Sequence, residues 1–352
     1  YTNIPITQTL MGLGAVAANN KNFLGMLGMH GTYEANMAMH DCDVMLCVGA
    51  RFDDRITGNL KYFSPNSKKI HIDIDPSSIN KNVKVDLAVI GDCYYILNML
   101  MKELKASKSK INKNSIDKWW KTIDKWKRKD CLSFIDSEKS IKPQRALQEL
   151  NKGLKGQDAY ITTEVGQHQM WAAQYLDFNK PNRWMTSGGL GTMGYGFPAA
   201  IGVQVAHPKK PVVCVAGEAS FLMNIQELSS LKQLNIPVKV FILNNEYMGM
   251  VRQWQEFFHG GRYSESYSDS LPDFIALANS FGIKGMRVTD PKDLKSSIAE
   301  MMNHDGPVIM DVCVDKMENV FPMIPAGAAH NDMKLNDHDE KEAQTSEGMG
   351  LL

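Results

Sequence analysis

Two oxygen-bearing side chains, Glu218 and Asn245, follow apolar runs that have the character of β-strands. Segment 212–217 leads into Glu218, and segment 238–244 leads into Asn245. Parallel strands end at one edge of a sheet, so this spacing predicts that both side chains lie at that edge. A carboxylate and a carboxamide are hard oxygen ligands that suit a Mg²⁺ ion sharing phosphate oxygens. The small residues beside Glu218 would let a diphosphate approach the backbone and the next helix N-terminus.

The same residues allow a second interpretation. A glutamate after a strand can begin a capped helix, and an Asn-Asn pair is typical of a polar turn. The types and spacing of Glu218 and Asn245 leave both interpretations open.

Short apolar runs alternate with helical patterns along most of the chain. Segments 44–48 and 70–76 have the character of parallel strands buried on both faces, the first ended by glycine and the second by proline. Similar runs occupy 212–216, 238–243 and 308–312. Strands that alternate with helices predict an α/β fold of two Rossmann-like domains with parallel sheets.

A basic segment separates the two predicted domains. Residues 102–129 hold 11 Lys or Arg against 3 acids, together with Trp119, Trp120 and Trp126. Such a segment can be a nucleic-acid patch, or a solvated linker whose tryptophans dock onto the flanking domains. The whole chain has 39 basic and 39 acidic residues, a net charge of zero, which favours the linker and argues against a nucleic-acid partner.

Composition narrows the class of protein further. No apolar run approaches the roughly 20 residues of a membrane helix, so we expect no membrane association. The six cysteines are scattered without a CxxC pair, which indicates reduced thiols and a cytoplasmic location. The chain starts at Tyr1 without an initiator Met or a signal core, and we therefore expect a segment to precede it.

The segment that ends at Asn245 resembles a known signature. Residues 217–245 begin Gly-Glu-Ala-Ser and end Asn-Asn, which is similar to the thiamine diphosphate signature, although that signature usually has Asp at the position of Glu218. Five more stretches match in the same order along the chain: 27–31, 49–55, 163–171, 186–194 and 249–254. Together, from about residue 9 to about 333, they resemble the catalytic subunit of acetohydroxyacid synthase (acetolactate synthase).

The resemblance implies a domain organisation. It predicts an FAD-binding middle domain at 1–106, a linker at 107–143, a thiamine diphosphate- and Mg²⁺-binding domain at 144–330 and an acidic tail at 331–352. Members of this family also have a first domain that supplies a catalytic glutamate. That glutamate has no counterpart here, so we expect the chain as given to be inactive by itself.

Roles at the thiamine diphosphate site are implied residue by residue. Glu218, Asn245 and the carbonyl of Tyr247 match the metal ligands. Met193 matches the bulky residue that props the cofactor into a bent form, and the carbonyl of Gly191 matches an acceptor for its amine system; a core methionine is the alternative for Met193. The remaining cofactor contacts implied are Val165, Gly166, Gln167, His168, Gly217, Ala219, Ser220, Met248, Gly249 and Met250.

Trp254 and Arg55 match residues that meet the keto-acid substrates, and Met250 is assigned to the same catalytic group. An indole beside the cofactor can pack against the extra methyl of 2-ketobutyrate, and a guanidinium can bind a carboxylate. A tryptophan that only covers core is the alternative for Trp254.

The resemblance also implies an FAD site in the middle domain. Gly49, Ala50 and Arg51 follow a predicted strand and can meet a diphosphate, and Asp73 ends the next strand, where a carboxylate commonly binds ribose. The implied FAD contacts are Thr9, Leu10, Gly12, Leu27, Gly28, Met29, His30, Gly49, Ala50, Arg51, Asp53, Arg55, Asp73, Ile74, Asn80, Gly91, Asp92 and Cys93.

The activity implied is the thiamine diphosphate-dependent decarboxylation of pyruvate and its condensation with pyruvate or 2-ketobutyrate, in branched-chain amino acid biosynthesis. The implied partners are these small 2-keto acids, further copies in a homodimer or larger homo-oligomer, and a separate regulatory subunit. Two other interpretations remain: a related enzyme such as pyruvate oxidase or a keto-acid decarboxylase, and a non-catalytic nucleotide-binding module.

Overall fold

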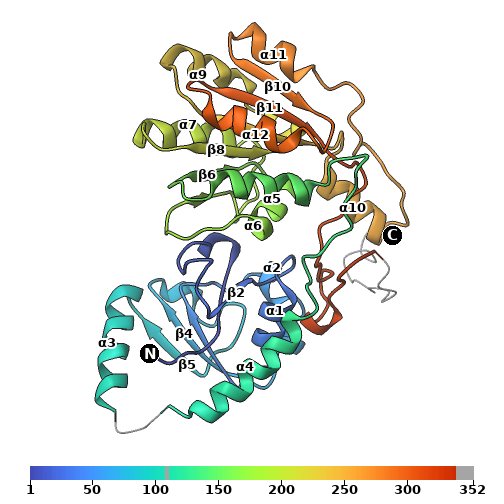
Figure 1. The fold of residues 1–352 in the computed structure, drawn as a ribbon. Coiled ribbons are helices and arrows are strands. Elements are labelled where there is room, and N and C mark those ends of the chain that lie inside the picture. Colours follow the sequence, from blue (N-terminus) through green and yellow to red (C-terminus); the bar gives the residue numbers. More distant parts are fainter. Residues whose placement is uncertain (108–110, 338–352) are drawn as a thin grey trace. The chain divides into compact units, whose positions relative to one another are not determined.

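The protein, described here from a computed structural model, forms two compact units (Figure 1). The structure describes residues 1–107 and 111–337. Unit 1 contains Tyr1–Thr9, Lys21–Leu132 and the chain from Phe321 onward, and unit 2 contains Leu10–Asn20 and Ser133–Val320. Within the described residues, all pairings between the strands of the three sheets are parallel, which confirms the predicted α/β class with parallel sheets.

Unit 2 is built on a six-stranded sheet in the order β10-β11-β9-β8-β6-β7. The predicted strand at 212–216 is β8, and those at 238–243 and 308–312 are β9 and β11 with boundaries shifted by one residue. The strand bounds are β6 (Tyr160–Thr163), β7 (Trp184–Met185), β8 (Val212–Ala216), β9 (Lys239–Asn244), β10 (Lys284–Val288) and β11 (Val308–Cys313). Because β7, β6, β8 and β9 are consecutive neighbours, the loops after these four strands lie along one edge of the sheet.

Helices cover both faces of this sheet. One face packs against α7 (Gly196–Ala206), α9 (Leu228–Leu234) and α11 (Phe274–Ser280). Residues of these helices and Phe221 pack with alternate strand residues in one hydrophobic core, in which Phe197, Phe221 and Phe274 are fully buried. A second layer contains α5 (Pro143–Leu154), α6 (Gln167–Tyr175) and α12 (Leu294–Asn303), in which α5 contacts both of the others. The unit also has α8 (Glu218–Leu222), α10 (Gly249–Phe258) and 3₁₀ turns at Leu10–Gly12 and Ile225–Glu227.

Unit 1 contains a two-stranded and a three-stranded sheet. Strands β1 (Ile6–Gln8) and β2 (Phe23–Met26) form the first, and β3 (Val44–Val48), β4 (Lys68–Asp73) and β5 (Leu87–Ile90) form the second in that order. Its helices are α1 (Tyr33–Asp41), α2 (Asp54–Thr57), α3 (Cys93–Ala106) and α4 (Lys113–Lys127), with 3₁₀ turns at Leu60–Tyr62, Pro76–Ser78 and His330–Asp332. Thr32 caps α1 and Asp92 caps α3 through side-chain oxygens that accept backbone N–H groups, which fixes where both helices begin.

Strand β3 differs from the sequence prediction. Its apolar run predicts burial on both faces, but Val44, Leu46 and Val48 are 52%, 37% and 37% exposed, and only Cys47 is buried. Side chains alternate between the two faces of a strand, so the exposed residues share one face. Among the described residues, nothing buries that face, which is why the prediction of complete burial is wrong for β3.

The basic segment contains helix α4, which packs against α1 and β2 within unit 1. Within α4, the rings of Trp119 and Trp126 meet edge to face with centroids 5.4 Å apart, as their spacing of seven predicts for one helical face. Ile123 between them is fully buried in a cluster with residues of α1 and β2, and the Trp120 indole donates to the carbonyl of Asn3 at 2.8 Å. The tryptophans therefore dock this part of the segment onto unit 1.

The compact units place the boundaries elsewhere than the predicted domains do. Residues 10–20 lie in unit 2, and residues 321–330 lie in unit 1. The structure describes the tail predicted at 331–352 only as far as Asp337, and residues 338–352 lie outside the described part of the chain. Within the described part of this tail, Lys334 pairs with Met323. Within residues 1–107 and 111–337, none of the helices combines the length and apolar character that a membrane crossing requires.

Candidate cofactor site

The residues predicted to bind thiamine diphosphate gather on four loops of unit 2. These loops follow β6, β7, β8 and β9, and the same strands are neighbours in the sheet. The loop after β6 carries Val165, Gly166, Gln167 and His168; that after β7 carries Gly191 and Met193; that after β8 carries Gly217, Glu218, Ala219 and Ser220; and that after β9 carries Asn245, Tyr247, Met248, Gly249 and Met250. The fold thus brings all of them to the carboxyl edge of one sheet.

Glu218 is a buried carboxyl group at this edge. It is 1% exposed at the first position of α8, and its Oε1 atom has no hydrogen-bond partner among the described residues. Burial raises the pKa of Glu218 to about 8, against the lowering effect of the backbone amides of Asn245 and Tyr247, and nearby Asp311 raises it further. A buried oxygen without a partner, close to a second carboxylate, is the environment that a bound cation would compensate.

Asn245 connects two of the cofactor loops. Its amide nitrogen donates to Oε1 of Gln167 at 3.2 Å, and its Oδ1 atom accepts the backbone N–H of Tyr247 at 3.2 Å. The turn after Asn245 is closed by a hydrogen bond from Met248 N to the carbonyl of Ser266 at 2.8 Å. Asn245, a predicted metal ligand, is therefore held beside the turn that begins α6 and is only 5% exposed.

Three glycines let side chains of neighbouring loops pack directly against their backbone. A Cβ added to Gly249 would lie 2.0 Å from Oε1 of Gln167. A Cβ on Gly217 would lie 2.7 Å from Nδ1 of His168, and one on Gly166 would lie 2.8 Å from its Cε1. The His168 ring and the Gln167 side chain occupy the space that a side chain at these positions would need, so glycine brings the loops after β6, β8 and β9 into close contact.

His168 stays neutral at this site. It is 6% exposed, and burial lowers its pKa to about 3, with a hydrogen bond to the Glu164 backbone acting in the opposite direction. Its Nε2 atom has no partner among the described residues. A neutral ring with one available nitrogen can contact a polar cofactor atom without adding charge.

Glu164 lies within the matching stretch 163–171, but the resemblance assigns it no role. This residue follows β6 directly and is completely buried, and its carboxylate accepts the backbone N–H groups of Gly194 and Phe197 at 2.6 and 2.8 Å. The sequence signal that could have identified Glu164 is an acidic residue directly after the strand at 160–163. Its partners lie 30 and 33 residues further along the chain, so the sequence did not identify them.

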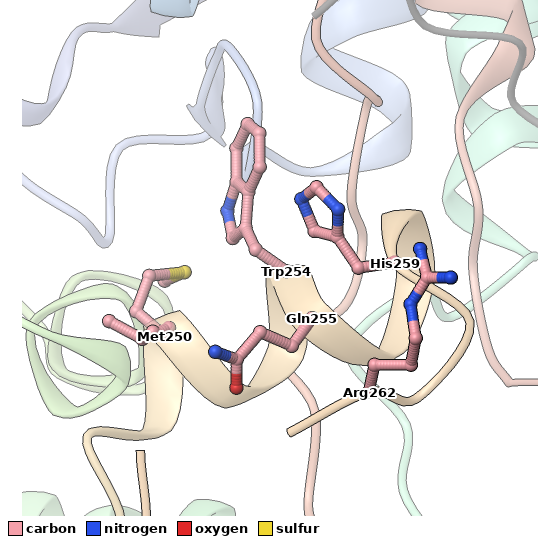
Figure 2. Close-up of a pocket in the computed structure, with 6 residues that line it drawn as sticks. Met250, Trp254, Gln255, His259 and Arg262 are labelled. Carbon is pink, nitrogen blue, oxygen red and sulfur yellow. The ribbon is translucent and has the colours of Figure 1, made fainter. Parts of the chain in front are cut away.

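Helix α10 carries Met250 and Trp254 beside a pocket of about 570 Å³ (Figure 2). Met250, Trp254 and Gln255 line the pocket from the helix, and His259 and Arg262 line it from the residues that follow. The Trp254 ring is partly buried and packs on Phe258 with centroids 5.0 Å apart. Both the substrate-contact and the core-covering interpretation of Trp254 therefore remain compatible with its position.

A second set of predicted residues gathers in unit 1. Gly49, Asp73 and Gly91 end the neighbouring strands β3, β4 and β5, with Gly49 N donating to Ile72 O at 2.8 Å and Gly91 N to Asp73 O at 2.9 Å. The Asp73 carboxylate is 6% exposed and accepts the N–H of Asp75 at 2.8 Å. Other predicted FAD contacts follow the same three strand ends: Ala50, Arg51, Asp53, Arg55, Ile74, Asn80, Asp92 and Cys93.

The predicted contacts after β2 are held against the chain beyond residue 320. His30 is buried, which lowers its pKa to about 4, and its Nδ1 atom lies 3.1 Å from the carbonyl of Pro322. Met29 and Arg55 line a small cavity of about 70 Å³ together with His330. Leu27 and Gly28 complete this turn, where Gly28 N donates to the Asn36 side chain at 2.8 Å.

Two predicted groupings cross the boundary between the units. Thr9 belongs to unit 1, whereas Leu10 and Gly12 belong to unit 2, where the Trp184 indole donates to the Leu10 carbonyl at 2.9 Å. Arg55 belongs to unit 1 and Trp254 to unit 2. Their assignment to common sites stays a prediction.

The described residues contain no group of three or more His, Cys, Asp or Glu side chains arranged to hold a metal ion. The predicted Mg²⁺ set has one carboxylate, one carboxamide and one backbone carbonyl. A magnesium ion that keeps several waters and shares phosphate oxygens requires only one or two protein carboxylates. The single carboxylate of Glu218 is compatible with that type of binding.

Comparison with known proteins agrees with this geometry. Residues 164–312 match the C-terminal TPP binding domain of thiamine pyrophosphate enzymes, and residues 1–100 match the central domain of the same enzymes. The first match covers all four loops of the candidate site, and the second covers β1 to β5. The chain belongs to the thiamine pyrophosphate enzymes.

Within that family, the chain is homologous to acetolactate synthase large subunits. It is 47% identical over 337 residues to the acetolactate synthase isozyme 3 large subunit of Escherichia coli K12, which covers 95% of this chain and 58% of that protein. It is 47% identical over 340 residues to the large subunit of Haemophilus influenzae, covering 96% and 59%, and 46% identical over 334 residues to that of Cyanidium caldarium, covering 95% and 57%. The chain spans nearly three-fifths of the length of these relatives.

Proposed function

We propose that this chain forms the cofactor-binding part of an acetolactate synthase, which decarboxylates pyruvate and condenses the product with pyruvate or 2-ketobutyrate. The observation that carries the proposal is the buried Glu218 carboxyl with an unpartnered oxygen, at the end of β8 beside the neighbouring strand β9, which leads into Asn245. The names of the relatives at 46–47% identity support the same reaction.

Glu218, Asn245 and the carbonyl of Tyr247 would hold Mg²⁺ against the diphosphate. Gly166 and Gly217 stand at the N-cap positions of α6 and α8, and the backbone amides that begin these helices would stabilise the phosphate charge. When bound, thiamine diphosphate supplies a nucleophilic carbon for the keto group and accepts the electron pair released with CO₂. The residues of this chain bind the cofactor, orient it through Gly191 and Met193, and exclude water.

FAD binding is a further proposal for unit 1. The ends of β3, β4 and β5 combine glycines with a buried carboxylate at Asp73, which suits a diphosphate beside a ribose. Ile74 is 67% exposed directly after Asp73 and offers an apolar contact for a flat ring. Arg51 is an exposed guanidinium already oriented by Asp53 at 2.7 Å.

Association and location are also proposals. The relatives are named large subunits, which supports a separate regulatory subunit for this protein, together with assembly into a homodimer or larger homo-oligomer. A cytoplasmic location is supported by the six cysteines, all free and none paired as a disulfide.

The proposal is tested by cofactor binding and by turnover. Thiamine diphosphate is titrated into the protein with and without Mg²⁺, and binding is followed by tryptophan fluorescence. We expect Mg²⁺-dependent binding and acetolactate formation from pyruvate when the protein has the full length of its relatives. We expect residues 1–352 alone to form no acetolactate. Thiamine diphosphate binding that does not depend on Mg²⁺, or a full-length protein that forms no acetolactate, would contradict the proposal.

A further inference from the structure

Glu164 is a buried acid at the candidate site whose function has not been assigned. It follows β6 directly and is 0% exposed. Its Oε2 atom accepts the N–H of Gly194 at 2.6 Å and its Oε1 atom accepts the N–H of Phe197 at 2.8 Å. Both partners lie around the N-terminus of α7, so the carboxylate caps this helix from another element of the fold.

This cap replaces one that the helix lacks. Tyr195 stands at the N-cap position of α7 and makes no side-chain hydrogen bond there. Burial raises the pKa of Glu164, while the backbone amides of residues 194–197 oppose that shift. Those amides and the positive end of the helix dipole compensate a negative charge at this point.

The loop before α7 carries the residues predicted to orient the cofactor. Gly191 and Gly194 adopt φ angles of 66° and 84°, which other residues rarely adopt. On the side opposite Glu164, the Asn224 side chain donates to the Gly194 carbonyl at 2.5 Å. The N–H and the carbonyl of Gly194 are therefore each held by a different side chain.

These two side chains connect the loop to the elements that carry the predicted diphosphate contacts. Glu164 directly precedes the turn that contains Gly166, and Asn224 follows α8, which begins at Glu218. Space behind the loop is tight, because a Cβ on Gly196 would lie 2.3 Å from the Thr163 carbonyl carbon. A shift of the loop would thus have to move these turns or break the Glu164 contacts.

We propose that Glu164 is a positioning residue, whose carboxylate holds the loop carrying Gly191 and Met193 in register with the turns that bind the diphosphate. The inference rests on the proposed function, because it concerns how that cofactor is oriented. Cofactor affinity then depends on Glu218 and Asn245, whereas turnover depends on Glu164 as well. A role limited to capping α7 would change the stability of the protein and leave turnover intact.

The test compares Glu164→Gln with Gln204→Ala in the protein of full length. Gln204 is 2% exposed near the other end of α7, where its amide donates to the carbonyls of His207 and Lys210 at 3.0 and 2.9 Å. Its removal weakens the same helix without touching the loop. Three quantities are measured for each variant: the Kd for thiamine diphosphate with Mg²⁺, kcat and KM for pyruvate, and the near-ultraviolet circular dichroism of the bound cofactor.

For Glu164→Gln we expect kcat to fall about 10-fold or more, with Kd changed less than about 3-fold and an altered circular dichroism of the bound cofactor. For Gln204→Ala we expect a lower Tm with kcat and circular dichroism unchanged. If Glu164→Gln does not fold, Glu164→Asp, which keeps the charge on a shorter side chain, is expected to show the same pattern to a smaller degree. Unchanged kcat in a folded Glu164 variant would overturn the proposal.

A separate readout does not depend on the cofactor. Amide hydrogen exchange of the cofactor-free protein is expected to be faster at Gly194 and Phe197 in Glu164→Gln than in the unmodified protein, and unchanged there in Gln204→Ala. Equal exchange at these amides would overturn the inference. Absence of thiamine diphosphate binding in the unmodified protein, with faster exchange in the variant, would reject the proposed function but keep the loop contact.

Discussion

Gln253 hydrogen-bonds through its side chain to both backbone groups of Val320. The Val320 N–H donates to Oε1 at 2.8 Å, and Nε2 donates to the Val320 carbonyl at 3.2 Å. The same Oε1 atom accepts Nε2 of Gln167 at 2.8 Å, and Gln253 is fully buried. Helix α10, the turn that begins α6 and the segment after β11 are therefore joined at one side chain.

Replacing Gln253 with Ala should destabilise unit 2. The change leaves two buried backbone groups of Val320 and the Gln167 amide with fewer partners, and each such loss costs about 1–3 kcal/mol. We expect the free energy of unfolding, measured by urea denaturation, to fall by at least that amount. Gln255→Ala on the same helix is the matched control, because its amide makes one bond, to the Ser264 carbonyl at 2.8 Å in an exposed setting. An equal loss in both variants would contradict the role of Gln253.

Mg²⁺ binding should depend on the protonation of Glu218. Its folded pKa of about 8 lies above its usual 4.5, so the metal-free protein holds this proton at neutral pH and must release it to bind the ion. We expect the affinity for Mg²⁺ and thiamine diphosphate to rise by up to about 10-fold per pH unit between pH 6 and 8, and then to level off. Calorimetry in buffers of different ionisation enthalpy should detect the released proton.

The metal-free protein should show the opposite trend in stability. The folded chain keeps the Glu218 proton between pH 4.5 and about 8 while the unfolded chain releases it, so this group's contribution to stability falls as pH rises through that range. Glu218→Gln removes the dependence, and the difference in unfolding free energy between the two proteins should follow the titration. In the same variant, affinity for the cofactor should drop about 10-fold or more, because a metal ligand is lost. A difference that is flat with pH would contradict the assignment.

Gly249→Ala should weaken cofactor binding. Its Cβ would lie 2.0 Å from Oε1 of Gln167 and 2.8 Å from Nδ2 of Asn245, so these two side-chain ends must shift and the hydrogen bond between them is disturbed. We expect the Kd for thiamine diphosphate with Mg²⁺, followed by fluorescence, to rise about 10-fold or more. In Gly202→Ala the new Cβ meets nothing within 4 Å on the exposed face of α7. That control should bind normally and be more stable by about 0.5–1 kcal/mol.

The fold class could be predicted because strands in a parallel sheet have a local signature. The run at 212–216 is apolar on both faces and that at 308–312 is apolar except for Asp311, as is typical of strands covered by helices on both sides, and they form β8 and β11. The same pattern gave a wrong prediction of burial at β3, where Val44 and Val48 are exposed in the described part of the chain. An apolar run predicts the strand, but the elements that cover it are set elsewhere in the sequence.

Contacts between residues that are far apart in the sequence leave no such local pattern. Residues 10–20 belong to unit 2 because of contacts such as that of Leu10 with Trp184, which are 174 positions apart. The raised pKa of Glu218 depends on burial and on Asp311, which approaches only in the folded sheet. The motif predicts which residue types lie at the candidate site. The protonation of Glu218, the cap that Glu164 provides for α7 and the hydrogen bonds of Gln253 become apparent only in the folded structure.

Trp254→Leu should change the choice of the second substrate. Trp254 lines the pocket on α10 with Met250, and a leucine there would remove the flat surface against which an extra methyl can pack (Figure 2). One methylene is worth about 1–3 kcal/mol in a well-formed pocket, so the preference for 2-ketobutyrate over pyruvate should fall roughly 5-fold or more. The measurement is the ratio of 2-aceto-2-hydroxybutyrate to acetolactate formed by the full-length protein from a mixture of the two keto acids.

Phe257→Leu is the matched control for Trp254→Leu. Phe257 is a partly buried aromatic residue on the same helix and is not among the residues that line the pocket. Its replacement removes comparable apolar area, so it should lower stability while leaving the product ratio unchanged. If Trp254 only covers core, both variants will lose stability and neither will alter the ratio. A shift confined to Trp254→Leu, with acetolactate synthesis largely kept, would show that the indole contacts the substrate.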